Sequence, residues 1–307
     1  MELRYDTISF LSDYGHDDEF VGVVKSVVRS IAPAVAVVDI THMIAPYDVR
    51  AGSLTLARSA QYLCPGVVIA VVDPGVGGER RSIAVEVGGG ISVLIGPDNG
   101  LLAPAVGLVG GASRAVELTN ADFQLAAPGP TFAGRDIFAP AAAHLCMGVD
   151  LLELGNEIDP AGLLPGMLPL SHVDDDGAFA AEVLWVDRYG NAQLNVDPAD
   201  VDDLGECINM RFPEGSRTAR RVATFSEIGA GEVALMVDSY GLLAVVLDRR
   251  SASTELGLRA GVAVHLEAFD DQQEGVAPRG VSTSVEIGRR PDDTEDQQAD
   301  RSEPVVP

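Results

Sequence analysis

Residues 67–81 read VVIAVVDPGVGGERR, and this stretch decides the expected fold. Its first six residues, 67–72, are all apolar and mostly β-branched, which is typical of a strand buried on both faces of a parallel or mixed sheet. The strand ends at Asp73, and a glycine-rich turn and two arginines follow it. The stretch therefore predicts an α/β domain with a carboxylate at the carboxyl end of a central strand.

The segments around this strand alternate between strand and helix patterns. The other expected strands are 7–11, 35–40, 82–87 and 92–95. The expected helices are 17–31, 48–63 and 135–147. This order predicts an N-terminal α/β sandwich-type domain with a largely parallel sheet over residues 1–165.

The second half has a different pattern. Residues 155–177 are rich in Gly and Pro and indicate a linker between domains. Short strands with turn signals between them are expected at 178–186, 192–196, 221–224, 233–237, 242–247 and 262–267. They predict a smaller C-terminal β-barrel over 173–269. Residues 270–307 are acidic and poor in large apolar groups, so we expect a disordered tail there.

The composition excludes several classes of protein. The chain has 46 acidic and 21 basic residues and a formal net charge of −25, which leaves little to neutralise nucleic-acid phosphates or anionic lipids. The three cysteines show no C-x-x-C spacing and indicate neither a disulfide framework nor a thiolate zinc site. We see no signal-peptide pattern and no apolar run of membrane-spanning length. A cytoplasmic protein without nucleic-acid or membrane partners is expected.

Three carboxylates lie at the expected carboxyl ends of strands: Asp13, Asp39 and Asp73. Ligands bind at that edge of an open α/β sheet. Each residue alone is as well explained by a turn or a helix cap, but three together favour a site. The arginine at position 80 is spaced to fold back and pair with Asp73. The glycine-rich turn lacks the phosphate-loop and dinucleotide patterns.

A metal site is weakly indicated. Residues 16–19 read HDDE, but acidic residues at the start of a helix are explained by the helix dipole. No other histidine has a partner at metal-binding spacing. We therefore expect no metal.

Two segments of the second half combine an aromatic ring, an amide or hydroxyl, and a carboxylate. They are 187–191 (DRYGN) and 238–241 (DSYG). Both are compatible with plain turns. The same groups also suit a ligand with a flat base to stack on and an ammonium group to hold.

Seven segments together resemble one family. They are 10–15 (FLSDYG), 38–42 (VDITH), 72–77 (VDPGVG), 96–100 (GPDNG), 131–140 (TFAGRDIFAP), 189–191 (YGN) and 239–243 (SYGLL). In this order, over about residues 5–268, the chain is similar to the S-adenosyl-L-methionine (SAM) hydroxide adenosyltransferases, which are related to SAM-dependent fluorinases and chlorinases. The resemblance implies an N-terminal α/β domain, a C-terminal β-barrel and a homotrimer with SAM between subunits.

The resemblance also implies a reaction and its residues. Water or hydroxide attacks the ribose 5′ carbon of SAM, which is the substrate, so that adenosine and L-methionine form without a cofactor. The implied substrate-binding residues are Asp13 and Tyr47 for the ribose, Asn191 and Tyr189 for adenine, and Asp187, Ser239 and Tyr240 for the methionine end. The implied water-handling residues are Asp73, Arg80 and a histidine at the position of Ala133.

Ala133 departs from the family pattern, which has histidine at this position. The methyl side chain of alanine neither donates a hydrogen bond nor moves a proton. We expect SAM binding to survive and turnover to be slowed, since a positioned base or donor contributes about 10²–10⁴-fold. Either another group orients the water or the residue is an introduced substitution. Asp73 favours water over halide as the nucleophile. The alternatives are a SAM-dependent halogenase, a non-catalytic SAM- or adenosine-binding protein, and a metal-dependent hydrolase using His16, Asp17 and Asp18.

Overall fold

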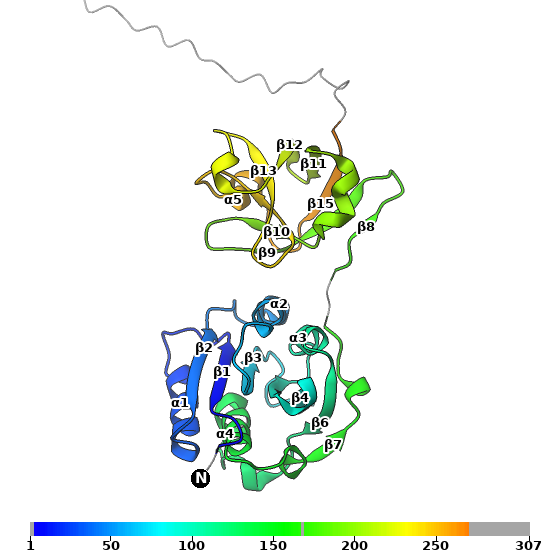
Figure 1. Cartoon of the computed structure of the whole chain (residues 1–307). Helices are drawn as coiled ribbons and strands as arrows, with labels where there is room; N and C mark the ends of the chain where they lie inside the picture. The colour runs from blue at the N-terminus through cyan, green and yellow to red at the C-terminus, as the bar shows by residue number, and fades with distance from the viewer. Residues whose placement is uncertain (1–2, 167–168, 270–307) are drawn as a thin grey trace, which may run out of the picture. The chain divides into compact units, whose positions relative to one another are not determined.

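The computed structural model describes residues 3–166 and 169–269, which form an N-terminal α/β domain and a C-terminal β-barrel (Figure 1). The acidic segment 270–307, expected to be disordered, lies outside the described residues. Among the helices of the described residues, none has both the length and the apolar character needed to cross a membrane.

The N-terminal domain is built on a seven-stranded sheet with the order β2-β1-β3-β5-β4-β6-β7. Its strands are β1 Thr7–Ser12, β2 Ala36–Thr41, β3 Val67–Val71, β4 Ser82–Val87, β5 Ser92–Pro97, β6 Ala112–Glu117 and β7 Asn156–Ile158. The neighbouring strands β2, β1, β3 and β5 pair in parallel, and β4, β6 and β7 add antiparallel pairings. The prediction of an α/β domain with a largely parallel portion is confirmed.

Helices cover both faces of this sheet, α1 and α4 on one face and α2 and α3 on the other (Figure 1). They are α1 Phe20–Ile31, α2 Val49–Ala60, α3 Ala103–Leu108 and α4 Ala139–Cys146, and a π-helical turn, η3 Gly134–Phe138, leads into α4. Strand β3 shows why a helical layer packs on each face of the sheet. Val67, Ile69 and Val71 join the core under α1 and α4, while Val68 and Ala70 join the core under α2 and α3.

The short helices of the chain connect these elements. They are η1 Gly88–Gly90, η2 Ala121–Phe123, η4 Leu151–Leu154, η5 Pro160–Gly162, η6 Pro198–Leu204 and η7 Phe225–Glu227.

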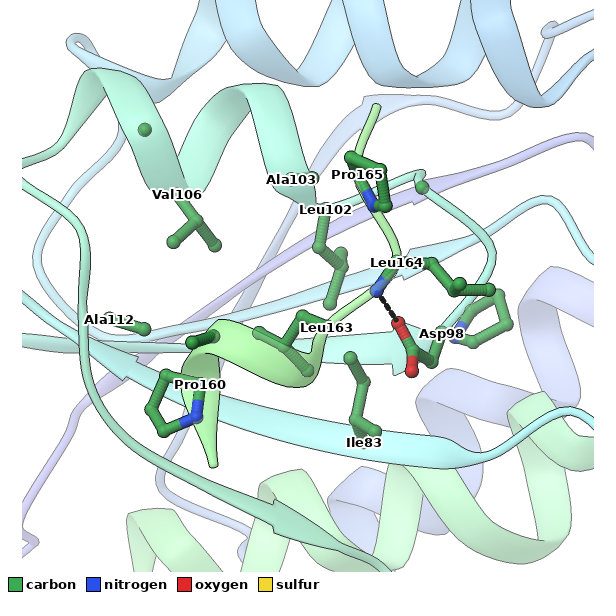
Figure 2. Close-up of a pocket in the computed structure, with 14 residues that line it drawn as sticks. Ile83, Asp98, Leu102, Ala103, Val106, Ala112, Pro160, Leu163, Leu164 and Pro165 are labelled. Atoms are coloured by element: carbon green, nitrogen blue, oxygen red, sulfur yellow. Dashed lines mark hydrogen bonds between the residues drawn. The ribbon is translucent and has the colours of Figure 1, made fainter. Parts of the chain in front are cut away.

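The predicted linker is shorter than expected. Strand β7 lies within the segment 155–177 and pairs with β6, so this part belongs to the N-terminal sheet. The following segment is fixed by Asp98, whose carboxylate accepts a hydrogen bond from the Leu164 N–H at 2.9 Å (Figure 2). The same carboxylate accepts a hydrogen bond from Arg81 Nε at 2.9 Å. Arg81 also donates to the Gly162 carbonyl at 2.7 Å. A cavity of about 360 Å³ remains between this segment, β5 and α3.

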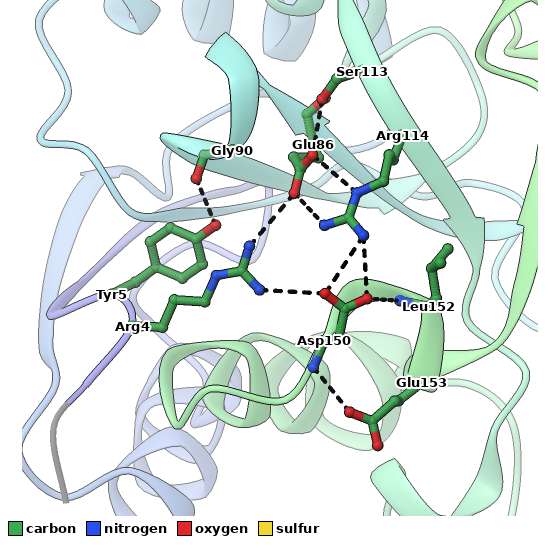
Figure 3. A network of polar contacts seen from close by, with 9 residues as sticks. All are labelled: Arg4, Tyr5, Glu86, Gly90, Ser113, Arg114, Asp150, Leu152 and Glu153. Carbon is green, nitrogen blue, oxygen red and sulfur yellow. Dashed lines mark hydrogen bonds and ion pairs between the residues drawn. The ribbon is translucent and has the colours of Figure 1, made fainter.

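An ion-pair network ties the start of the chain to the sheet (Figure 3). Glu86 on β4 accepts hydrogen bonds from Arg114 Nε at 3.0 Å and from Ser113 at 3.0 Å, and Arg4 lies 3.6 Å away. Arg114 also reaches Asp150 at 3.2 Å. Hydrogen bonds from Arg114 hold the pKa of Glu86 below its usual value.

We expect this network to make stability depend on pH. A carboxylate with a lowered pKa in the folded state stabilises at neutral pH, and the stabilisation is lost as pH falls through that pKa. Replacing Glu86 with glutamine should lower the free energy of unfolding at pH 7 by about 2 kcal/mol, because Arg114 keeps Asp150 but loses its charged hydrogen-bond acceptor on Glu86. The variant should then lose less further stability on acidification than the wild type does.

Urea unfolding between pH 7 and pH 3 measures both effects. Glu157→Gln, an exposed change on β7, is the matched control and should shift stability by less than about 0.5 kcal/mol. An unchanged pH dependence in Glu86→Gln would contradict the proposed contribution.

The C-terminal domain is a closed barrel. Its strands are β8 His172–Val173, β9 Phe179–Val186, β10 Ala192–Leu194, β11 Cys207–Phe212, β12 Gly215–Val222, β13 Val233–Val237, β14 Leu243–Val246 and β15 Ala263–Ala268, with a short helix α5 Ala252–Leu256. The order is β10-β14-β13-β12-β11-β15-β9-β8, and β10 also pairs with β9. That last pairing closes seven strands into the predicted barrel and leaves β8 outside the ring.

Candidate active site

The N-terminal half of the candidate site lies where the carboxyl ends of β1 and β3 meet. These strands are parallel neighbours, and Ser12 is aligned with Val71. The residues that follow, Asp13 and Asp73, therefore come to the same edge of the sheet. The chain crosses from β1 to β2 on one side and continues to β3 on the other, so this edge is a topological switch point, where such sheets bind ligands.

Asp13 is held against Tyr47, which the sequence placed in the same site. The backbone N–H of Tyr47 donates to Asp13 Oδ2 at 2.9 Å. Tyr47 has a φ of 68°, a left-handed conformation that costs a bulky residue free energy and that clusters at functional sites. Tyr47 as a whole residue is 73% exposed, so it is accessible to a ligand beside the Asp13 carboxylate.

The electrostatics at Asp13 differ from those of a surface carboxylate. Burial raises the pKa of Asp13, the negative charge of Asp73 raises it further, and the hydrogen bond from Tyr47 opposes the rise. Two carboxylates thus share one edge of the sheet, and bringing a cation there would relieve their mutual repulsion.

Asp73 and Arg80 form a buried bidentate ion pair. Arg80 Nε lies 3.0 Å from Asp73 Oδ1, and a second nitrogen lies 2.5 Å from Oδ2. The two side chains are 5% and 14% exposed. Gly75 lets the loop close, because a Cβ there would lie 3.2 Å from Arg80 Cγ. The predicted pairing across the glycine-rich turn is present in the structure.

Ala133 begins the turn that faces this loop. The Pro130 carbonyl approaches Gly77, which places the segment before Ala133 against the loop that carries Asp73. Ala133 is 6% exposed and packs in the core under α1 and α4. The guanidinium of Arg80 lies 5.8 Å from the ring centre of Phe138, in the same π-helical turn. The segment around Ala133 thus contacts the loop through Pro130 and lies near Arg80 through Phe138, and the methyl group of Ala133 supplies no polar atom.

Tyr14 is a site residue that we did not predict. A Cβ on Gly134 would overlap the Tyr14 hydroxyl, which therefore lies directly against the residue after Ala133. The charges of Asp13, Asp73 and Arg80 all act on this hydroxyl. The available signal was the polar aromatic residue directly after a strand-end carboxylate.

Asp39 is a correction to the predicted set. It lies within β2 instead of beyond its end, and it accepts a hydrogen bond from Lys25 Nζ at 2.6 Å. Its other oxygen lies 3.1 Å from His42 Nε2, and His42 Nδ1 lies 2.8 Å from Ser12 Oγ. Burial raises the pKa of Asp39, but the hydrogen bonds from Lys25 and His42 outweigh it and lower the pKa. Asp39 therefore supports the end of β1 through His42.

The metal interpretation finds no support in the described residues. Within 3–166 and 169–269, no three His, Cys, Asp or Glu side chains gather as a metal site would require. Helix α1 begins at Phe20, so the acidic residues 17–19 precede it and none lies in its first turn. The expectation that they belong to that helix is wrong by one turn.

The barrel carries the second half of the candidate site. A cavity of about 930 Å³ is lined by all five barrel residues that the resemblance implied, together with Trp185, Phe225 and Arg250. Those five are Asp187, Tyr189, Asn191, Ser239 and Tyr240. Tyr189 and Tyr240 are 79% and 49% exposed as whole residues, and exposed aromatic residues in a cavity can stack on a flat ligand.

The two turns of the cavity are built alike. Asp187 Oδ1 accepts from the N–H groups of Tyr189 at 2.8 Å and Asn191 at 2.9 Å, and Oδ2 accepts from Asn191 Nδ2 at 2.8 Å. Asp238 Oδ1 likewise accepts from Tyr240 and Leu242. Because its amide nitrogen is held by Asp187, Asn191 keeps its amide oxygen as an acceptor for a ligand.

Comparison with known proteins agrees with this arrangement. The model of the SAM hydroxide adenosyltransferase N-terminal domain matches residues 8–155, and that of the C-terminal domain matches residues 181–265. The chain is 42% identical over 261 residues to an (R)-S-adenosyl-L-methionine hydrolase of Salinispora tropica, covering 85% of this chain and 97% of that relative. A hydrolase of the same name from Thermus thermophilus is 40% identical over 267 residues, covering 84% and 98%.

More distant relatives and solved structures extend the comparison. A fluorinase of an Actinoplanes species is 27% identical over 286 residues, covering 84% of this chain and 96% of that relative. A conserved protein of Thermotoga maritima has a similar structure, with a TM-score of 0.77, 30% identity, and coverage of 85% of this chain and 99% of that chain. Both domain models and the hydrolase relatives span nearly all of the described residues, and the chain belongs to the SAM hydroxide adenosyltransferase family.

Proposed function

We propose that this protein hydrolyses SAM to adenosine and L-methionine by attack of water on the ribose 5′ carbon. The observation that carries the proposal is the buried Asp73–Arg80 pair beside Asp13, at the switch point of the sheet, in a chain of this family. A carboxylate fixed by a guanidinium is a site that accepts a hydrogen bond from water and holds it in one orientation.

The two halves of the site bind different parts of the substrate. Asp13 receives the ribose hydroxyls, and the exposed ring of Tyr47 lies against the sugar. Asn191 hydrogen-bonds the adenine edge with Tyr189 beside it. Asp187 and Ser239 hold the methionine end next to Tyr240. The hydrogen bonds of its own turn use three of about four lone-pair sites of the Asp187 carboxylate, so one remains for an ammonium group.

Hydrolysis of SAM needs few catalytic groups from the protein. The C5′–S bond breaks and its electron pair goes to sulfur, which turns a sulfonium cation into a neutral thioether. The water oxygen bonds to C5′, and its proton leaves toward Asp73 and then solvent. Because the leaving group needs no acid, in-line positioning and desolvation carry most of the barrier reduction.

Asp73 favours water over halide. A buried carboxylate accepts a hydrogen bond from water, whereas it repels a halide ion. The fluorinase relatives nevertheless make halogenation the second candidate function. Incubating the protein with SAM, with and without added halide, and separating adenosine, methionine and 5′-halo-adenosine distinguishes the two. Tight SAM binding without any of these products would instead indicate a binding protein.

Ala133 gives a prediction of its own. If the missing polar group at this position slows turnover, Ala133→His should raise kcat for adenosine release by about tenfold or more, within the usual contribution of a positioned donor or base. The dissociation constant for SAM should stay near that of the wild type. Ala133→Leu is the control for size and should give no gain. An unchanged kcat in Ala133→His would refute the role of the position.

We also infer a homotrimer in which each site combines the N-terminal half of one subunit with the barrel of the next. The support is the separation of the predicted binding residues between two domains and the family resemblance. Light scattering tests it, and a monomer would contradict the shared site.

A further inference from the structure

Tyr14 is held rigidly by three aromatic rings. Its ring centre lies 6.3 Å from that of Phe10, 5.5 Å from Phe20 and 5.6 Å from Phe132. The contacts with Phe10 and Phe132 are edge-to-face, the geometry that aromatic pairs prefer. The cluster fixes the direction of the phenol, so its hydroxyl is a positioned group.

The Tyr14 hydroxyl lies among the groups of the proposed water site. Gly134 lies directly against it, and the lack of a side chain on Gly134 makes room for the hydroxyl. Asp13, Asp73 and Arg80 are close enough for their charges to act on the phenol. Burial raises the pKa of Tyr14, so the group stays neutral throughout the physiological range.

A neutral hydroxyl supplies what the charged pair lacks. Both oxygens of Asp73 accept hydrogen bonds from Arg80, so this carboxylate has a fixed direction. A phenol both donates and accepts hydrogen bonds, so the Tyr14 hydroxyl can donate its proton to a water molecule. A water molecule between Asp73 and Tyr14 would then have its lone pair directed by two partners.

We propose that the Tyr14 hydroxyl is a catalytic residue that orients the attacking water, next to the backbone of the position where Ala133 offers no polar group. This inference rests on the proposed function. Tyr14 keeps its proton during the reaction, because the proton released by the water passes to Asp73 and solvent. Ala133 therefore leaves the site with one neutral water-orienting group instead of two.

Tyr14→Phe tests the inference because it removes only the hydroxyl and keeps the ring among its neighbours. We expect kcat for adenosine release to fall about 10²-fold. The dissociation constant for SAM and the melting temperature should stay within the error of the wild type. Ala133→His should raise kcat by a larger factor in Tyr14→Phe than in the wild type, because the histidine then supplies the only neutral water-orienting group, whereas a mere loss of packing would leave that factor unchanged.

Tyr5→Phe is the matched control. Tyr5 is also a buried tyrosine of the N-terminal domain, and its hydroxyl donates to the Gly90 carbonyl at 2.9 Å. Its kcat should equal that of the wild type. If the wild type is active and Tyr14→Phe retains its kcat, or loses SAM affinity in proportion, this inference is overturned alone. A wild-type protein that releases no adenosine overturns the proposed function and this inference with it.

Discussion

Replacing Asp73 with asparagine is expected to lower kcat for SAM cleavage by about 10²–10⁴-fold, the contribution of a positioned proton acceptor. The amide keeps the shape of the side chain but loses the charge and one acceptor oxygen. Water then loses its fixed partner, while Asp13 and the barrel residues still bind SAM. The dissociation constant should therefore change little, so the effect appears in kcat measured at saturating SAM.

The same change should destabilise the protein. Arg80 would keep its charge without a carboxylate, which costs about 3–5 kcal/mol in a buried pair. Asp98→Asn is the matched control, because Asp98 is 3% exposed and pairs with Arg81, the next residue, away from the proposed site. It should lower stability and leave the kcat of the folded protein unchanged. Equal losses of kcat in both variants would show that Asp73 acts only through stability.

Replacing Asp13 with asparagine should have the second large effect, in affinity. A hydrogen bond to a charged group contributes about 1.5–3 kcal/mol, so losing the charge opposite the ribose hydroxyls should raise the dissociation constant for SAM by about 10–10²-fold. Isothermal titration with adenosine and with adenine separates the cause. Adenosine should lose affinity as SAM does, whereas adenine, which has no ribose, should be unaffected.

The direction in which SAM affinity changes with pH identifies Asp13 as the titrating group. In the proposed site the ionised form of Asp13 accepts hydrogen bonds from the ribose hydroxyls, so we expect SAM affinity to fall as pH drops through a pKa that burial has raised above the ordinary value of about 3.9. Asp13→Asn should lack that fall. Because the folded state binds this proton more tightly than the unfolded chain, ionised Asp13 destabilises the fold at pH 7. The variant should thus be at least as stable as the wild type, unlike Asp73→Asn.

The sequence predicted the parts of the fold that local pattern determines. Continuous apolar runs at β1 and β3 indicated buried parallel strands, and the shared edge of parallel strands then brought Asp13 and Asp73 together. Strand β6 was missed because ASRAVE mixes polar and apolar residues without strict alternation. Strand β11 was missed although residues 208–212 (INMRF) alternate apolar and polar, which is the pattern of a half-buried strand. Helix α3 was missed because six residues are too few for helical periodicity to show.

The rest of the site depends on contacts between distant segments. Asp39 looked like a strand-end carboxylate, and only its contact with Lys25 on α1 shows that it is occupied elsewhere. Tyr14 belonged to a recognised segment, but the position of its hydroxyl depends on Gly134, 120 positions later in the chain. The glycine has no side chain and so leaves space for the hydroxyl. The Gly- and Pro-rich segment 155–177 could not reveal that Asp98 fixes Leu164.

The two adjacent arginines have a consequence for how this loop can change in length. Arg80 pairs with Asp73 and Arg81 with Asp98, so neighbouring residues serve two different carboxylates. Arg81 is also fixed by its backbone, because its carbonyl accepts a hydrogen bond from the Asp98 N–H at 2.9 Å, next to the β4–β5 pairing. A shorter turn would therefore leave Arg81 on Asp98 and draw only Arg80 away from Asp73. The length of the glycine-rich turn thus determines the geometry of the ion pair in the proposed site, while the pair behind it does not depend on that length.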